Sequence, residues 1–269
     1  MQLLLSDAWL RRFAGIGRLY GQKALMLFAR SHICVVGIGG VGSWAAEALA
    51  RTGIGTITLI DLDDVCVTNI NRQLHALSNT IGQSKVEVMK SRILQINPEC
   101  QVNIIDDFVS ASNLAELISI QFDYVIDAID SMRPKAALLA YCRRHKIPVV
   151  TTGGAGGQLD PTQIQVKDLA KTIHDPLAAK LRERLKSDFK IVKNSNSKGT
   201  LGIDCVFSTE QLVYPQSDGT VCKAKSNAGG TMRMDCAAGL GAATMVTASF
   251  GFIAVSHVLK KLQRKMIAS

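Results

Sequence analysis

Closely spaced cysteines are missing from this 269-residue chain, and so are the metal sites that they build. Its seven cysteines never come closer than fourteen positions apart, which leaves no Cys-x-x-Cys pair and no zinc-knuckle spacing. We therefore expect no zinc. No signal peptide is recognisable either, so we expect reduced thiols and a cytoplasmic location. The cysteines are Cys34, Cys66, Cys100, Cys142, Cys205, Cys222 and Cys236.

Aromatic residues make up only 5% of the chain and are scarce where its positive charge gathers. The basic segment 171–198 holds one aromatic residue, Phe189, so we expect no stacking platform for single-stranded nucleic acid there. The net charge of +9 still favours an anionic partner such as nucleic acid, with ordinary solubility charge as the alternative. Within the segment, a solvated charged helix and a nucleic-acid backbone contact both remain open. Its basic residues include Lys180, Arg182, Arg184, Lys186, Lys190, Lys193 and Lys198.

A glycine-rich turn is the feature around which the chain is organised. Residues 37–42 spell Gly-x-Gly-x-x-Gly between a β-rich run and a helical segment, which is the context that such a motif needs. Gly37 would permit the tight turn, Gly39 would let a phosphate approach the backbone, and Gly42 would let the helix pack close to the strand. Asp61, roughly 20 residues further on, is placed to hold a ribose hydroxyl. The pattern predicts a Rossmann-like nucleotide site.

The residues that follow this acid distinguish an ATP site from a dinucleotide site. A dehydrogenase needs no cationic cluster here, because its cofactor is not cleaved and carries no terminal triphosphate. This chain places Arg72 soon after the acid, between Asn71 and Gln73, and Lys85 lies further on. Such cations neutralise the charge that builds up on a polyphosphate during cleavage. We therefore predict an ATP site that cuts the α,β-phosphate bond or holds the triphosphate.

Strand-like and helix-like segments alternate along the chain, which predicts an α/β fold with a Rossmann-like, doubly wound, mostly parallel sheet. With 47% hydrophobic residues, the chain is long enough to bury a full core as one large domain. A C-terminal half-sheet is expected from 164–166 and 205–208. The other expected strands are 33–36, 56–60, 101–105, 124–126 and 148–151, and the expected helices are 22–30, 41–51, 84–96, 114–120 and 134–145.

Acidic residues follow two of the expected strands. In doubly wound sheets ligands bind beyond the carboxyl ends of the strands, so the glycine turn, residues 61–63 and residues 127–130 would converge on one crevice. Asp130 is then placed to hold a magnesium ion on the phosphates. A cap for the helix that starts near Pro134 is the alternative role of this side chain.

The stretch 11–21 carries three arginines around its glycines and has the composition of an arm. Such an arm can deliver Arg11 or Arg12 to the phosphates of its own subunit or of a neighbouring one. A solvated basic face is the alternative.

Residues 237–258 form an uncharged run long enough to cross a bilayer, and a basic tail follows at 260–265. Thirteen of the 22 residues in the run are Gly, Ala, Ser or Thr, which makes it weakly lipophilic and suited to close packing. We expect a helix of small residues buried against the sheet or at a subunit interface, with a membrane span as the alternative.

Three late cysteines are candidate nucleophiles. Cys205 lies in an apolar strand, which favours a core position. Cys222 and Cys236 lie in glycine-rich, basic surroundings that favour thiolates, yet neither has a histidine nearby in the sequence. A covalent cysteine intermediate is therefore open and not required.

These motifs together resemble the ubiquitin-activating-type superfamily (HesA/MoeB/ThiF), whose bacterial members include the adenylyltransferases of thiamine and molybdopterin synthesis. The arginine-rich stretch joined to Leu19-Tyr20-Gly21, the absence of zinc cysteines and the small-residue tail look most like its branch of tRNA threonylcarbamoyladenosine dehydratases. The resemblance covers nearly the whole chain, and its most specific motifs precede Thr152. Those motifs are residues 37–43, 61–63, 69–73, 85 and 127–130.

The resemblance implies ATP-dependent activation of a carboxylate. Adenylation releases pyrophosphate, and an internal oxygen or nitrogen of the same substituent then displaces AMP and closes a ring. In this branch the carboxylate belongs to the threonylcarbamoyl group on the adenosine beside the tRNA anticodon, so the expected activity is dehydration of N6-threonylcarbamoyladenosine. One alternative is an adenylyltransferase that activates the C-terminal carboxylate of a ubiquitin-like sulfur-carrier protein. Another is a membrane-anchored nucleotide-sensing scaffold.

The resemblance also implies roles for residues and partners. Arg72, Lys85, Asp130 and Arg12 become the expected catalytic residues, and Asp130 the magnesium ligand. The expected partners are tRNA and a second copy of the chain, with a monovalent cation (Na+ or K+) and a cysteine desulfurase system as optional additions. Residues 1–152 become the ATP-binding part, and residues 153–269 the substrate and dimer part of the same domain. The expected nucleotide-binding residues are Gly37, Gly39, Gly40, Gly42, Asp61, Asp63, Asn69, Asn71, Arg72, Gln73, Lys85, Asp127, Asp130 and Ser131.

Overall fold

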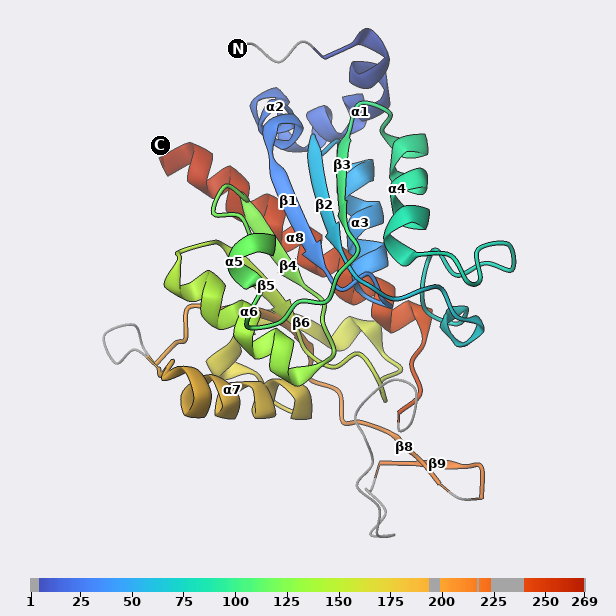
Figure 1. Ribbon diagram of the computed structural model, residues 1–269, viewed down its shortest axis with the longest axis vertical. Coiled ribbons are helices and arrows are strands. Elements are labelled where there is room, and N and C mark those ends of the chain that lie inside the picture. Colours follow the sequence, from blue (N-terminus) through green and yellow to red (C-terminus); the bar gives the residue numbers. More distant parts are fainter. Residues whose placement is uncertain (1–4, 194–198, 217, 224–239, 269) are drawn as a thin grey trace.

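Seven strands form one sheet at the centre of the structure (Figure 1). The computed structural model describes residues 5–193, 199–216, 218–223 and 240–268. The strands are β1 (His32–Val36), β2 (Thr56–Ile60), β3 (Gln101–Ile105), β4 (Tyr124–Asp127), β5 (Val149–Thr152), β6 (Ile164–Asp168) and β7 (Asp204–Ser208). Their order is β3-β2-β1-β4-β5-β7-β6, and only the edge strand β6 runs antiparallel to its neighbour in this described part of the chain. The doubly wound, mostly parallel fold is therefore confirmed, and the expected half-sheet continues the first sheet.

Alternation along the central strands gives the sheet two buried faces. In β1, Ile33 and Val35 belong to the core on one face, whereas Cys34 and Val36 belong to the core on the other. Successive side chains of a strand point to opposite faces, so an uninterrupted apolar run requires cover on both sides. Helices provide that cover.

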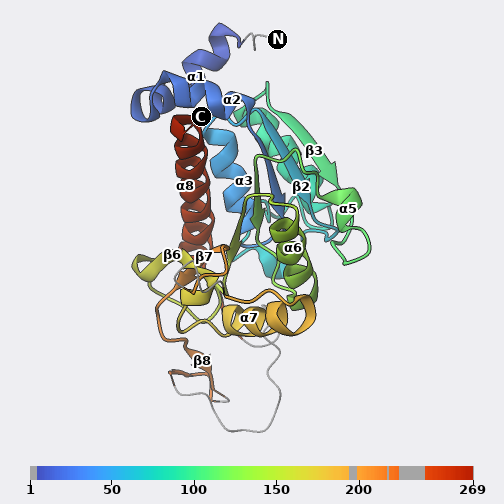
Figure 2. The ribbon, with the colours of Figure 1, turned by 90° about the vertical axis from the view of Figure 1, so that its left-hand side faces the viewer.

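The helices form one layer on each face of the sheet (Figure 2). On one face lie α3 (Gly42–Arg51), α4 (Lys85–Ile96) and α8 (Thr244–Ala268). On the other face lie α5 (Leu114–Leu117), α6 (Met132–Arg144) and α7 (Pro176–Phe189). A short hairpin of β8 (Tyr214–Pro215) and β9 (Val221–Cys222) lies beyond the end where the parallel strands finish.

Small residues let α8 approach α3 closely. A Cβ atom on Gly251 would lie 2.7 Å from the carbonyl oxygen of Val41 and 2.9 Å from the nitrogen of Ala45. By length and composition α8 could cross a membrane, but 56% of the most apolar 18-residue stretch of this helix is buried inside the structure. The expected helix packed against the sheet is thus confirmed for 244–258; residues 240–243 precede the helix, and residues 237–239 lie outside the described part of the chain.

The expected arm at 11–21 is wrong. Residues 11–20 belong to α1 (Asp7–Tyr20), and Gly21 separates α1 from α2 (Gln22–Arg30). The two helices lie across the end of the sheet where the strands begin (Figure 1). The Ser6 hydroxyl caps α1 by accepting from the Trp9 N–H at 3.0 Å, and Trp9 and Phe13 bury their rings one turn apart. The helical spacing of the buried residues therefore stabilises a helix here, although the two glycines have low helix propensity.

Candidate nucleotide-binding site

A cavity of ≈ 490 Å³ opens at the carboxyl ends of the parallel strands. It lies where the strand order reverses between β1 and β4, which is the position at which doubly wound sheets bind ligands. Most of the predicted residues line it. These are Gly37, Gly39, Gly40, Asp61, Asp63, Asn69, Arg72, Gln73, Lys85, Asp130 and Ser131.

The glycine turn is shaped by close backbone contacts. Gly37 has φ +87°, which favours glycine, and a Cβ there would lie 2.9 Å from the Ala128 carbonyl carbon and oxygen. A Cβ on Gly42 would lie 1.8 Å from the Gly37 carbonyl oxygen, so glycine is required where α3 meets the turn. Above Gly39 the nearest atom to such a Cβ is Gln73 Nε2 at 3.8 Å. The turn therefore leaves room for a ligand to approach the backbone at Gly39.

Asp61 holds the turn in place through backbone amides. Its carboxylate accepts from the Ile38 N–H at 2.5 Å and from the Asp63 N–H at 2.9 Å. Burial of the side chain raises the pKa of Asp61, and the nearby ammonium of Lys85 opposes this shift. The acid that sequence spacing assigns to a ribose therefore also anchors the glycine turn.

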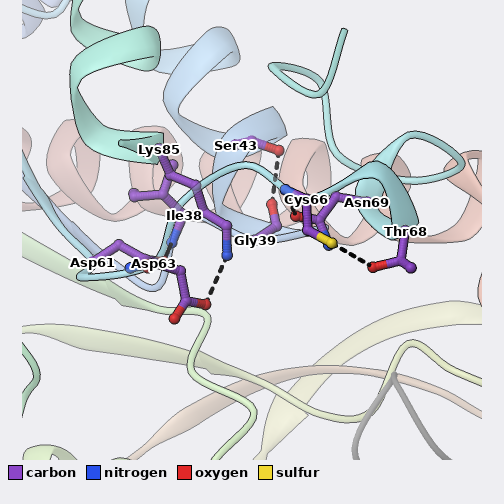
Figure 3. A network of polar contacts seen from close by, with 9 residues as sticks. All are labelled: Ile38, Gly39, Ser43, Asp61, Asp63, Cys66, Thr68, Asn69 and Lys85. Atoms are coloured by element: carbon purple, nitrogen blue, oxygen red, sulfur yellow. Dashed lines mark hydrogen bonds and ion pairs between the residues drawn. The ribbon is translucent and has the colours of Figure 1, made fainter. Parts of the chain in front are cut away.

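Lys85 places a buried ammonium at the cavity wall (Figure 3). It is the first residue of α4, its side chain is 6% exposed, and its Nζ lies 2.7 Å from Asp63 Oδ2. Asp63 is itself 59% exposed, so this pair is open to solvent on the carboxylate side. The lysine is thus desolvated and aimed at the cavity, where an anion can replace Asp63 as its partner.

Arg72 is fixed by its neighbours on a short loop. Its Nη1 donates to the Thr68 carbonyl at 2.8 Å and to Asn71 Oδ1 at 3.2 Å. The Arg72 carbonyl accepts from the Trp44 indole N–H at 3.0 Å, which ties the loop to α3. Asn69 caps the loop by accepting from the Cys66 N–H at 3.0 Å (Figure 3). The guanidinium is therefore held at the cavity edge by one backbone carbonyl and one side-chain amide oxygen.

Two buried acceptors on the cavity wall have no hydrogen-bond partner among the described residues. They are the side-chain oxygens of Gln73 and Gln158, which are 6% and 2% exposed. The Gln158 amide nitrogen donates to the Gly154 carbonyl at 2.8 Å, which fixes the orientation of that amide. A nucleotide with its amino and hydroxyl groups carries donors of the kind that such acceptors need.

Asp127 is not on the cavity wall, contrary to the expectation that it binds the nucleotide. Its side chain is fully buried, pairs with Lys135 Nζ at 2.9 Å and accepts from the Thr151 hydroxyl at 2.6 Å. Lys135 also donates to the Ile129 carbonyl at 2.9 Å. The pair therefore anchors the loop that presents Asp130, because Asp127 is the last residue of β4 and faces α6.

Three more of the expected site residues, Gly42, Asn71 and Arg12, do not line the cavity. Gly42 serves packing, and the Asn71 amide donates to the Ala242 carbonyl at 2.8 Å. Arg12 is exposed on α1 at the opposite end of the sheet, so it is not part of the cavity of its own chain (Figure 1). Among the described residues, no three His, Cys, Asp or Glu side chains gather to hold a metal ion. A metal at Asp130 therefore requires ligands from phosphate and water.

The candidate cysteines fall into different surroundings. Cys205 is fully buried, and burial raises the pKa of its thiol, which confirms a core position. Cys222 is exposed on β9, whereas Cys236 lies outside the described residues. Cys66 was not singled out from the sequence: it is exposed, and a hydrogen bond from the Thr68 hydroxyl at 3.3 Å lowers the pKa of its thiol (Figure 3).

The wall of the cavity that follows β5 was not expected from the sequence. Residues 152–156, Gln158 and Asp175 line it. A readable signal existed for Asp175, because an acid directly before Pro176 is typical of a helix start, and its carboxylate does accept from the Ala178 N–H at 2.9 Å. Gln158 carried no signal in the sequence.

A glycine turn at the switch point of a doubly wound sheet, with buried cationic and amide side chains around it, defines a nucleotide-binding α/β protein. The chain belongs to the ThiF family, whose family model matches residues 13–268.

Several relatives match nearly the full length of the chain. It is 73% identical over 265 residues to the tRNA threonylcarbamoyladenosine dehydratase of Escherichia coli (strain K12), covering 98% of each chain. The Haemophilus influenzae protein of the same name is 56% identical, with 96% of each chain covered. A crystal structure of the E. coli dehydratase in complex with ATP has a TM-score of 0.89 and 66% identity, and the match covers 99% of this chain and 100% of that one.

Proposed function

We propose that this protein is an ATP-dependent dehydratase that cyclises N6-threonylcarbamoyladenosine in tRNA next to the anticodon, through adenylation of its carboxylate. The observation that carries the proposal is the desolvated Lys85 ammonium facing the open space over Gly39. Near full-length likeness to proteins named as tRNA threonylcarbamoyladenosine dehydratases supports the substrate. The solved ATP complex of one such relative supports ATP as the co-substrate.

The chemistry explains why ATP is needed. A free carboxylate resists attack because an oxide is a poor leaving group. When its oxygen attacks the α-phosphorus of ATP, pyrophosphate leaves, and the carboxylate carbon then carries AMP as a leaving group. An oxygen or nitrogen of the same substituent displaces AMP and closes the ring, so the net change in the nucleoside is the loss of one water.

The side chains of the cavity have separate tasks in this scheme. Lys85 and Arg72 take up charge on the departing pyrophosphate, with Lys85 exchanging Asp63 for a phosphate oxygen. Asp61 holds the ribose. Asp130 and Ser131 are exposed at the start of α6, and Asp130 holds magnesium together with the phosphates, since that ion commonly takes one or two carboxylates plus phosphate and water.

The remaining proposals concern the assembly. We propose that residues 1–152 bind ATP, that residues 153–269 supply substrate and dimer contacts, and that the protein is a cytoplasmic homodimer. Met245 and Phe252, 64% and 45% exposed on α8, offer apolar surface for a second copy. An arginine of α1, Arg11 or Arg12, would then act on the partner's site. A monovalent cation and a cysteine desulfurase partner are further additions that follow from the family resemblance.

The test is a reaction with ATP, magnesium and tRNA that bears the open modification. Mass spectrometry of the digested nucleosides should show a nucleoside lighter by one water. AMP that forms only with a small carrier protein ending in Gly-Gly, and never with tRNA, would instead support the sulfur-carrier adenylyltransferase. Serine replacements of Cys222 and Cys236 add a second criterion, because a thioester mechanism loses activity in one of them and the dehydratase keeps it.

A further inference from the structure

A second hollow of ≈ 390 Å³ adjoins the nucleotide cavity. The two share three wall residues, Asp175, Pro176 and Leu212. The rest of the second hollow comes from α7, from the segment before it and from the β8–β9 hairpin. Its other lining residues are His174, Ala179, Arg182, Gln211, Tyr214 and Lys223.

The shared wall contains a turn at His174 and Asp175 that is strained in its backbone and fixed by hydrogen bonds. His174 has φ 56°, a left-handed conformation that non-glycine residues rarely adopt. This turn directs the buried Asp175 carboxylate at two backbone amides, those of Ala178 at 2.9 Å and Gly154 at 3.1 Å. A Cβ on Gly153 would lie 1.7 Å from Asp175 Oδ2, so the contact between α7 and the loop after β5 is tight. The wall that the two hollows share is therefore fixed.

The second hollow is cationic and carries a tyrosine ring. Arg182 and Lys223 supply positive charge, and Asp175, the one carboxylate among the described residues of the lining, is 5% exposed and bonded to amides. Arg182 is held rigidly by the Leu169 carbonyl at 3.3 Å and by the Thr172 hydroxyl. Tyr214 is half-buried and pairs across the hairpin with Cys222, next to the exposed Lys223. Positive charge beside an aromatic ring is the chemistry that binds single-stranded RNA.

We propose that this second hollow binds the RNA strand that adjoins the modified nucleotide, with Lys223 on a backbone phosphate and Tyr214 stacked on a neighbouring base. The inference rests on the proposed function, because it places the modified adenosine in the first cavity. A base next to the anticodon lies in a loop, so its neighbours are unpaired and must leave the cavity through its mouth. Asp175, Pro176 and Leu212 line both spaces, so the cationic hollow lies beside the first cavity, where these neighbours emerge.

Binding of a fluorescent anticodon stem-loop RNA, measured by anisotropy without ATP, tests the hollow directly. Lys223→Gln and Tyr214→Leu should each weaken stem-loop binding about tenfold while the Kd for ATP stays unchanged. Lys223→Gln should also reduce the slope of log Kd against log salt by about one. Two controls should bind as wild type does: Tyr214→Phe keeps the ring, and Lys186→Gln removes an exposed cation of α7 that does not line the hollow.

The outcomes separate this inference from the proposed function. Stem-loop binding that depends on Lys223 and Tyr214, without any dehydration of a modified stem-loop, supports the hollow and contradicts the activity. The inference is overturned if the stem-loop does not bind wild type, if Lys223→Gln and Tyr214→Leu bind it as wild type does, or if Lys186→Gln weakens it equally. It is also overturned if these substitutions weaken binding of a carrier protein and not of RNA.

Discussion

Lys85 Nζ lies 2.7 Å from Asp63 Oδ2, and the two residues differ sharply in exposure, 6% against 59%. A lysine that is nearly fully buried needs a charged partner. Here the exposed Asp63 carboxylate can move into solvent when a phosphate group binds the ammonium. The pair therefore holds the ammonium in place before the triphosphate binds. Figure 3 shows that this contact reaches across from α4 to the loop after β2, next to the turn at Ile38 and Gly39.

The first prediction concerns this lysine. Lys85→Met should lower pyrophosphate release by roughly 100-fold to 1000-fold, because the variant loses a preorganised cation at the point where charge develops. Lys90→Met is the matched control, since Lys90 lies on the same helix and does not line the cavity. Steady-state release of pyrophosphate measures both. Similar rates in the two variants would remove Lys85 from the reaction.

Asp130 is predicted to act through magnesium. Asp130→Asn should lower turnover by roughly 100-fold and raise the magnesium concentration needed for half-maximal rate, while the melting temperature stays within a few degrees of wild type because the side chain is exposed. Asp106→Asn, an exposed carboxylate outside the cavity lining, should change neither quantity. A magnesium titration of the reaction is the measurement, and an unchanged titration in Asp130→Asn contradicts the metal assignment.

His75 is predicted to make the fold sensitive to acid. The residue is 1% exposed, and neither ring nitrogen has a partner in hydrogen-bonding geometry among the described residues. Burial lowers its pKa to about 4, with the Lys85 charge adding to the shift and the Ile38 backbone partly opposing it. Between pH 6.5 and 4 the unfolded chain binds a proton that the folded chain does not. The free energy of unfolding should therefore fall by roughly 3 kcal/mol across this range as the pH decreases.

His75→Leu tests this acid sensitivity. The variant should lose most of the pH dependence between pH 6.5 and 4 and keep near wild-type stability at pH 7, because no hydrogen bond of the ring is lost. Urea unfolding at a series of pH values gives the slopes. If the slopes of wild type and variant coincide, His75 does not carry the effect.

Two glycines should respond oppositely to alanine. Gly42→Ala places a Cβ 1.8 Å from the Gly37 carbonyl oxygen, so α3 must shift and the free energy of unfolding should fall by about 3 kcal/mol or more. Gly15 is exposed in α1, and a Cβ there would lie 3.9 Å from the nearest atom, the Arg18 Nη2. Gly15→Ala should therefore raise the free energy of unfolding by roughly 0.5–1 kcal/mol. Chemical unfolding of both variants measures the contrast. A stable Gly42→Ala protein would mean that the turn tolerates a wider approach.

Local patterns were sufficient to predict most of the sheet. β2 and β3 begin and end at the residues expected, because short β-branched runs bounded by glycine and polar residues admit few alternatives. The roles of Gly37 and Gly42 also followed from the motif, since each depends on backbone sterics within a few residues. By contrast, α1 was misread because two glycines obscured an apolar stripe that only tertiary packing completes.

The remaining differences arise from contacts between distant segments. Asp127 follows a strand, as a ligand-binding acid does, but Lys135 from α6 draws its carboxylate into the core, and nothing in the local sequence reveals that pair. The wall formed by Gln158 and Asp175 depends on how α7 returns across the sheet. The cavity was therefore predictable where motifs between Gly37 and Ser131 build it, and unpredictable where segments after β5 close it.

Transfer of heavy oxygen from substrate to AMP tests the central claim most directly. If the threonylcarbamoyl carboxylate of the tRNA is labelled with heavy oxygen and the reaction is run with ATP, adenylation followed by ring closure must leave one labelled oxygen in the phosphate of AMP. Mass spectrometry should therefore find singly labelled AMP in amounts equal to the dehydrated nucleoside. Unlabelled AMP, or label that appears in inorganic phosphate with ADP as the product, would contradict activation of the carboxylate by adenylation.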